Sequence, residues 1–252
     1  MNPVYSAAVA ASLTSFQTFG WKVRAFGQHH VPVSGPAVIA TNHVGYLDFV
    51  FAGYGVRRGT GRQVRFVAKR EVFDNAVAGP LMRAMGHIRV DRGGDTRIAM
   101  SEVADALAGG DLVGMFPEGT INRSFVPLTG RPGAARMAIE SGVPLVPGAV
   151  WGSQRIFTKG RKLRPAYGTA VLISFGPRID YAPDEDPLAV HERLMASIRT
   201  QVDTLQRRYP QQPSGPDDAW WQPAHLGGTA PTPEEAEARA RSDREARRRS
   251  DA

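Results

Sequence analysis

The chain has 252 residues, 42% of them hydrophobic and 22% charged, which is enough for one sizeable folded domain with appendages. It contains no cysteine, and this excludes disulfide scaffolds, thiol nucleophiles and cysteine-ligated zinc or iron–sulfur sites. The formal net charge of +7 favours anionic partners: nucleic acid, anionic lipid or phosphorylated substrates. The acidic and basic residues of 234–252 cancel, so the positive surplus belongs to the body of the chain.

We expect the protein to be neither exported nor membrane-spanning. No stretch reaches the ~18 consecutive apolar residues that a membrane span needs. No basic residue precedes Lys22, and Ser, Thr and Gln interrupt the apolar run, which is atypical of a signal peptide. We therefore expect a cytoplasmic protein.

The first 26 residues have helical spacing and form the first part of a segment that we place at 1–28. The apolar stripe includes Val9, Leu13 and Phe16 and continues to Val23 and Phe26. An apolar stripe with aromatic and nearby basic residues can lie in a bilayer interface, and it can equally pack on its own domain. The stripe alone does not distinguish these two surfaces.

The next part of the chain, 29–209, alternates between two patterns and forms the main domain. Short β-branched runs predict buried strands, and the segments between them predict helices. Such alternation is typical of an α/β fold with a mostly parallel central sheet flanked by helices. The predicted strands are Ala37–Thr41, Val64–Ala68, His87–Val90, Leu112–Phe116, Val143–Val150 and Thr169–Phe175; the predicted helices are Tyr46–Val56, Val77–Met85, Thr96–Ala108, Gly133–Glu140 and Leu188–Arg208.

Residues 210–252 form an extension of different composition. Its first half is rich in Pro and Gly, and its second half mixes Glu and Arg densely enough to form a solvated helix. The pair Trp220-Trp221 is too apolar to stay in water without a partner. We expect it to dock on the domain or to enter lipid.

A histidine and an acid follow the first of these strands. His43 comes directly after Ala37–Thr41 and Asn42, and Asp48 lies five residues later, past Gly45. On a regular helix the two side chains would point apart, so they can meet only with His43 on the turn and Asp48 in the first helical turns. Asp48 would then fix the imidazole tautomer and leave the other nitrogen as a base. The alternative is a core histidine beside an unrelated acid.

No nucleophile accompanies this pair in the sequence. There is no G-x-S-x-G elbow and no cysteine, so the attacking group would be a hydroxyl of the substrate.

A second cluster, Met115-Phe-Pro-Glu-Gly-Thr120, also follows an apolar strand. Its glycine and threonine can present backbone N–H groups to an anion, and Arg123 just beyond adds a donor suited to phosphate. Glu118 could orient that arginine or a substrate hydroxyl. An ordinary Pro-Gly turn with a salt bridge is the competing interpretation.

Two further clusters complete the set. Arg92 ends a run from Gly86 and precedes two glycines, which suits an anion-binding loop, although its charged neighbours could simply pair with one another. The run Gly142–Val150 is apolar and holds two prolines, which argue against a central strand and favour a hydrophobic wall.

Together these four clusters resemble the glycerolipid acyltransferase family, which includes 1-acyl-glycerol-3-phosphate acyltransferase and is marked by H-x-x-x-x-D and F-P-E-G-T blocks. The first block here is His43 to Asp48 and the third is Phe116 to Thr120, with the arginine block between them and the Val-Pro block after them. The resemblance covers roughly residues 31–178. Each block alone is weak, and four in order are specific.

The resemblance implies a reaction and its partners. His43 would be the general base and Asp48 its orienter, with neither a metal nor another cofactor. The co-substrate would be acyl-CoA or an acyl carrier protein. The acceptor would by default be lysophosphatidate, with glycerol 3-phosphate or another lysolipid as the alternative. The enzyme would be peripheral on the cytoplasmic face of an anionic membrane.

The resemblance also implies acceptor-binding positions. This chain has Ile-Asn between F-P-E-G-T and Arg123-Ser124, where relatives often have Arg-Ser directly, so the role of Arg123 is less secure. Lys69 matches a frequent basic position. The implied substrate-binding residues are Arg92, for phosphate, and Glu118, Gly119, Thr120, Arg123 and Lys69.

Residues 155–164 place five positive charges in ten residues, which suits lipid headgroups, CoA phosphates, an acidic carrier protein or plain solvent. Two rival functions remain open. A nucleic-acid-binding module fits the charge but lacks any known signature. A metal hydrolase could use His43, Asp48 and Glu118, although a lone histidine is a poor zinc set.

Overall fold

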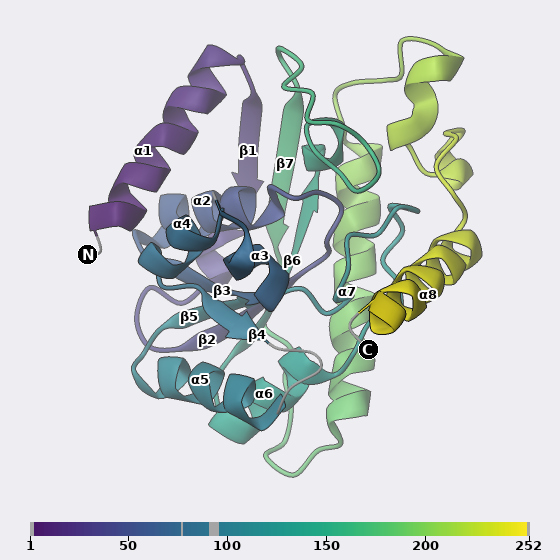
Figure 1. The fold of residues 1–252 in the computed structure, drawn as a ribbon. Helices are drawn as coiled ribbons and strands as arrows, with labels where there is room; N and C mark the ends of the chain where they lie inside the picture. Colours follow the sequence, from purple (N-terminus) through teal and green to yellow (C-terminus); the bar gives the residue numbers. More distant parts are fainter. Residues whose placement is uncertain (1–2, 77, 91–95, 251–252) are drawn as a thin grey trace.

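The computed structural model describes residues 3–76, 78–90 and 96–250. It contains one seven-stranded sheet between two layers of helices (Figure 1). The strands are β1 (Lys22–Phe26), β2 (Ala37–Thr41), β3 (Val64–Lys69), β4 (Ile88–Val90), β5 (Leu112–Met115), β6 (Leu145–Trp151) and β7 (Ala170–Phe175). The helices are α1 (Pro3–Thr18), α2 (Asp48–Thr60), α3 (Arg70–Asp74), α4 (Ala78–Ala84), α5 (Thr96–Ala108), α6 (Gly133–Ser141), α7 (Pro187–Arg207) and α8 (Pro233–Ser250), with short 3₁₀ turns at Gln28–His30, Ser153–Arg155, Pro216–Trp221 and Ala224–Leu226.

The strand order is β1-β7-β6-β2-β5-β3-β4, and every neighbouring pair is parallel except β6–β7. The carboxyl ends of β2, β3, β4, β5 and β6 therefore meet at one edge of the sheet. In open α/β sheets this is the edge that carries ligand sites. The predicted α/β class with a mostly parallel sheet is confirmed.

Two apolar cores hold the layers together. On one face of the sheet, Phe16 of α1 and Phe51 of α2 pack with strand residues such as Ile39. On the other face, α5, α6 and α7 pack through residues that include Leu107 and Leu194. Full burial of a side chain of this size contributes about 1.5–3 kcal/mol.

The predicted helix over the first 26 residues is wrong for its last part. The helix ends at Thr18, Gly20 takes a positive φ of 60°, and residues 22–26 form β1. β1 alternates exposed and half-buried residues, and it adds to the sheet edge as a parallel partner of β7. Val23 and Phe26 fit the helical stripe by spacing, but charged and apolar residues alternate here, which is a strand period.

The predicted strand over 143–150 is present as β6, but it is a central strand, contrary to the expectation from its two prolines. β6 lies between β7 and β2 and is buried throughout. The carbonyl of Pro147 accepts a hydrogen bond from the Gly176 N–H, so its missing donor falls on the β7 side. Pairing with β7 begins only at Gly148–Phe175. The proline therefore removes no hydrogen bond from the ladder between β6 and β2.

The C-terminal extension returns to the domain. Trp221 is buried and joins the core beneath α7, so one of the two alternatives for the tryptophan pair, docking on the domain, is confirmed for this residue. The charged end forms α8, whose Ala236 and Ala240 are buried. Within the described ranges, no helix is long and apolar enough to cross a membrane.

Candidate active site

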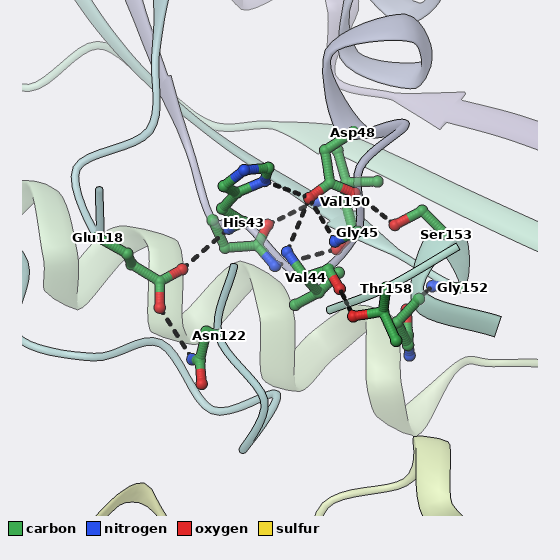
Figure 2. Close-up of polar contacts among 12 residues, drawn as sticks. His43, Val44, Gly45, Asp48, Glu118, Asn122, Val150, Gly152, Ser153 and Thr158 are labelled. Carbon is green, nitrogen blue, oxygen red and sulfur yellow. Dashed lines mark hydrogen bonds and ion pairs between the residues drawn. The ribbon is translucent and has the colours of Figure 1, made fainter. Parts of the chain in front are cut away.

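The turn from β2 to α2 carries the histidine at the carboxyl edge of the sheet (Figure 2). The backbone register between β2 and β6 ends at Thr41–Gly148. The Asn42 side chain then replaces the ladder: its amide donates to the Val150 carbonyl (3.0 Å) and its oxygen accepts from the Val150 N–H (2.7 Å). Asn42 thus fixes where the chain leaves the sheet, and His43 is the next residue.

Asp48 is the first residue of α2 and points back at the turn. Its Oδ2 lies 2.8 Å from the Nδ1 of His43 and accepts hydrogen bonds from the N–H groups of Val44 (2.7 Å) and Gly45 (2.8 Å) (Figure 2). The carboxyl group is fully buried. The expected contact between His43 on the turn and Asp48 in the first helical turn is confirmed. Because the carboxylate accepts, Nδ1 carries the proton and Nε2 is left for chemistry.

Ser153 also contacts Asp48, and it was not predicted from the sequence as a site residue. It lies two residues beyond the end of β6, and its hydroxyl donates to Asp48 Oδ1. A Cβ on Gly45 would lie 3.0 Å from Ser153 Oγ and 3.0 Å from the Phe157 carbonyl, so glycine allows this close approach. Two signals pointed to Ser153: it follows a buried strand, and that strand's run belongs to the same four blocks.

Ser153 does not act as a triad nucleophile in this arrangement. A Ser-His-Asp triad places the serine on the histidine nitrogen opposite the acid. Here the hydroxyl bonds the acid itself. The group that attacks must then come from elsewhere, which agrees with a substrate hydroxyl.

The imidazole of His43 lies at the surface of the site. It stacks on the ring of Phe116, with centroids 4.1 Å apart and planes 19° from parallel. Its side chain is 19% exposed, so a substrate can reach the ring. The Phe116 ring continues the stack to Phe66, 5.6 Å away. The histidine is thus held on one face by an aromatic wall and at Nδ1 by Asp48.

Glu118 is hydrogen-bonded to the main chain of the β2–α2 turn at His43. Its Oε1 accepts from the His43 backbone N–H (2.9 Å), and its Oε2 accepts from the Asn122 amide (2.8 Å) and the Leu128 N–H (3.0 Å). Burial raises the pKa of Glu118 from 4.5 to about 7, and these three donors oppose the shift. Glu118 orients the backbone of His43, and Arg123 pairs with a different acid.

Lys69, Gly119 and Thr120 lie at or just beyond the carboxyl ends of strands at the same edge of the sheet. Gly119 has a positive φ of 64° and closes a turn onto the Phe116 carbonyl (2.9 Å), and half-buried Thr120 follows it. Lys69 is the last residue of β3 and precedes α3. Arg92 lies outside the described residues. The binding roles of all these positions stay predictions.

Arg123 and the basic segment hold the C-terminal extension. Arg123 and Lys159 both donate to Asp243 of α8, at 3.0 and 2.5 Å. The guanidinium of Arg155 lies 4.4 Å from the Trp221 ring centroid, and that of Arg161 lies 3.8 Å from the Trp220 ring centroid. Three of the five basic residues of 155–164 thus contact the extension.

No group of three or more His, Cys, Asp or Glu residues that could hold a metal ion is found within 3–76, 78–90 and 96–250. His43 and Asp48 contact each other, whereas Glu118 bonds only main-chain N–H groups and the Asn122 amide. The three side chains are therefore not arranged as one ligand set.

A strand-turn-helix that presents a carboxylate-oriented histidine beside the F-P-E-G-T turn is the arrangement expected of an acyltransferase, and the sequence comparison agrees. The model of the Acyltransferase family matches residues 22–151. The chain belongs to this acyltransferase family.

Within this family, the chain is similar to curated proteins of known name. The chain is 30% identical over 142 residues to the 1-acyl-sn-glycerol-3-phosphate acyltransferase of Bacillus subtilis, covering 55% of this chain and 69% of that protein. It is 32% identical over 186 residues to the human 1-acyl-sn-glycerol-3-phosphate acyltransferase alpha, covering 72% of this chain and 64% of that protein. The chain thus spans about two thirds of the length of these relatives.

A solved structure shares the fold. The 1-acyl-sn-glycerophosphate acyltransferase PlsC of Thermotoga maritima superposes with a TM-score of 0.67 at 20% identity, covering 82% of this chain and 81% of that chain.

Proposed function

We propose that this protein transfers a fatty acyl group from an acyl thioester to the free hydroxyl of 1-acyl-glycerol-3-phosphate. The observation that carries the proposal is the His43 Nδ1–Asp48 Oδ2 contact of 2.8 Å on a ring that stays partly exposed. The matching relatives are named as 1-acyl-sn-glycerol-3-phosphate acyltransferases, which supports the choice of acceptor. The thioester is acyl-CoA or an acyl carrier protein.

The proposed reaction needs no acyl-enzyme. Nε2 of His43 takes the proton of the acceptor hydroxyl while the hydroxyl oxygen attacks the thioester carbonyl carbon. The tetrahedral intermediate then collapses, the C–S bond breaks, and the leaving thiolate receives the proton from the imidazolium. The products are an ester and a free thiol, and Asp48 stabilises the positive ring between the two proton transfers.

The basic surplus of the chain supports a phosphorylated acceptor, and we assign it to phosphate groups in place of nucleic acid. Arg123 lies one residue from Asn122, whose N–H donates to the His43 carbonyl (2.7 Å). A cation on the loop that is hydrogen-bonded to the His43 turn suits the phosphate of a small acceptor. The predicted roles of Arg92 and Lys69 in the same task belong to this proposal.

A donor and acceptor matrix tests the proposal. Purified protein would be given acyl-CoA or acyl carrier protein thioesters with lysophosphatidate, glycerol 3-phosphate or monoacylglycerol. We expect transfer to lysophosphatidate with release of one thiol per ester, and little transfer to monoacylglycerol, which lacks the phosphate. Equal rates with and without the phosphate would refute the acceptor assignment.

We further propose that the protein works at the cytoplasmic surface of a membrane. Exposed apolar side chains on three helices support this: Leu13 of α1, Val72 of α3 and Leu81 of α4. α1 and α4 are in contact, so two of these lie on adjoining elements (Figure 1). Exposed apolar side chains gathered on neighbouring elements are typical of surfaces that bind a membrane or a partner.

Vesicle flotation tests this location. We expect binding to vesicles that contain phosphatidylglycerol, weaker binding to neutral phosphatidylcholine vesicles, and loss of binding in a Leu13→Glu, Leu81→Glu double variant. Full binding by the folded double variant would contradict the assigned surface.

A further inference from the structure

Asp243 of the C-terminal helix lies between two cations of the domain. Its Oδ2 accepts a hydrogen bond from Arg123 Nη2 (3.0 Å) and from Lys159 Nζ (2.5 Å). The two cations come from separate loops, one after the F-P-E-G-T turn and one after β6. Both are mostly withdrawn from solvent, at 24% and 20% exposure. The two loops thus bring two positive charges to one carboxylate oxygen.

These two cations flank the turn that carries the general base. The residue before Arg123 is Asn122, whose N–H donates to the His43 carbonyl (2.7 Å). The residue before Lys159 is Thr158, whose hydroxyl donates to the Val44 carbonyl (2.6 Å; Figure 2). Each cation is therefore one residue away from a hydrogen bond to the same turn. The two loops that carry these cations are thus both hydrogen-bonded to the turn that carries the catalytic pair.

The carboxylate of Asp243 is a poor match for this pair of charges. A single oxygen of Asp243 accepts from both side chains. Arginine and lysine together carry two positive charges, and one carboxylate neutralises one of them. A phosphate monoester brings up to two negative charges and three acceptor oxygens, so it can give each cation its own oxygen.

α8 presents Asp243 on the face that packs against the domain. Ala236 and Ala240 are buried, and Asp243 follows them at the spacing i, i+4, i+7 that places three residues on one side of a helix. The docked face is small, since alanine side chains bury little area and partly exposed ion pairs contribute little. Figure 1 shows α8 at the edge of the molecule, at the end of a long extension.

We propose that Arg123 and Lys159 form a phosphate-monoester subsite beside the catalytic turn, and that Asp243 occupies this subsite as an internal competitor until the ligand displaces it. The inference rests on the proposed function and adds a second cation, Lys159, and a regulator, α8. The ligand is the phosphate of the acceptor or that of a CoA donor.

The test compares full-length wild-type protein with Asp243→Asn. A matched control is Glu237→Gln, which removes the same charge from the same helix at a residue that pairs with Arg241 within α8 (3.7 Å). Inorganic phosphate is the probe, titrated by calorimetry at constant ionic strength. If α8 is docked roughly nine times in ten, its release tightens phosphate binding about tenfold in D243N, and E237Q binds like wild type.

Two further arms make the result specific. Adding Lys159→Gln to D243N should abolish the gain, because the second cation is then absent. In turnover assays the KM of the phosphate ligand should fall in D243N while kcat stays within about twofold of wild type. A fall in the acceptor KM identifies the acceptor as the ligand, and a fall in the acyl-CoA KM identifies the donor.

The proposal is overturned if D243N binds phosphate no more tightly than wild type, or if E237Q gains as much as D243N, which would indicate general charge repulsion. Calorimetry needs no turnover, so its outcome is separate from that of the proposed function. Tighter phosphate binding by D243N without acyl transfer in any variant would support the subsite and refute the proposed reaction.

Discussion

Asp48 and Glu118 are both buried carboxylates that accept hydrogen bonds from the β2–α2 turn, but they meet different parts of it. Asp48 contacts the imidazole of His43 as well as two backbone N–H groups. Glu118 contacts the backbone of His43 and a loop that contains Asn122 and Leu128. The two buried acids therefore have separate tasks: one acts on the reacting ring, and the other on the shape of the turn.

The largest expected difference between the two acids comes from Asp48→Asn. The amide oxygen can still face the Val44 and Gly45 N–H groups, so the turn keeps its shape, but no negative charge remains to stabilise the protonated ring. We expect kcat to fall about 10²–10⁴-fold with little change in the melting temperature.

Steady-state kinetics and thermal unfolding of the same sample check this prediction. Asp111→Asn is the matched control, since Asp111 forms a partly exposed ion pair with Arg65 (3.0 Å) and should leave kcat unchanged. A folded D48N protein with wild-type kcat would mean that the two acids share the structural role.

The effect of Glu118 should instead be seen in how the free energy of unfolding depends on pH. Its pKa is raised to about 7 in the folded protein from an ordinary 4.5. Between these two pH values the native state thus binds more protons than the unfolded chain. The contribution of the Glu118 carboxyl group to stability is therefore fully present below pH 4.5 and is lost as the pH rises through about 7. The shift corresponds to about 3 kcal/mol.

Urea unfolding of wild type and Glu118→Gln between pH 4.5 and 8 isolates this contribution. We expect the unfolding free energy of wild type to fall relative to that of E118Q as pH rises, by up to about 3 kcal/mol. Parallel curves for the two proteins would contradict the raised pKa of Glu118.

The smallest of these effects is expected at Ser153, which touches only Asp48 of the pair. Removing its hydroxyl leaves Oδ1 of Asp48 without that donor and loosens the carboxylate. Ser153→Ala should lower kcat about tenfold with KM unchanged, because the acid acts on the ring in the chemical step. Ser174→Ala, which loses a hydrogen bond to Gln201 (2.8 Å), is the control. An equal loss of kcat in S174A, or no loss in S153A, would show that Ser153 does not position the His43–Asp48 pair.

Much of the fold follows from local patterns. β2 is a continuous apolar run that is buried throughout, and it has the predicted bounds. The helix α5 also has the predicted bounds, and β3, β5 and β7 differ from the prediction by one residue at an end. β1 was missed because its alternation is short and adjoins a helical stripe. β6 was doubted because a proline's place in a ladder depends on partners that are distant in sequence.

The contacts of the site likewise fall into those between residues close in sequence, which could be predicted, and those between distant residues, which could not. His43 and Asp48 are five residues apart, so a strand, a turn and a helix start suffice to bring them together. Ser153 reaches Asp48 across 105 positions and Asp243 reaches Arg123 across 120. Contacts of that range depend on strand order and on how an extension folds back, which no local pattern encodes.

The comparison between the two acids matters only if the ring that Asp48 orients is the base. Acyl transfer by purified His43→Ala, measured beside wild type and the exposed-histidine control His225→Ala, tests this directly. We predict that H43A loses at least about 10²-fold in rate and keeps its unfolding transition, while H225A behaves as wild type. A folded H43A protein that transfers acyl groups at the wild-type rate would contradict the account.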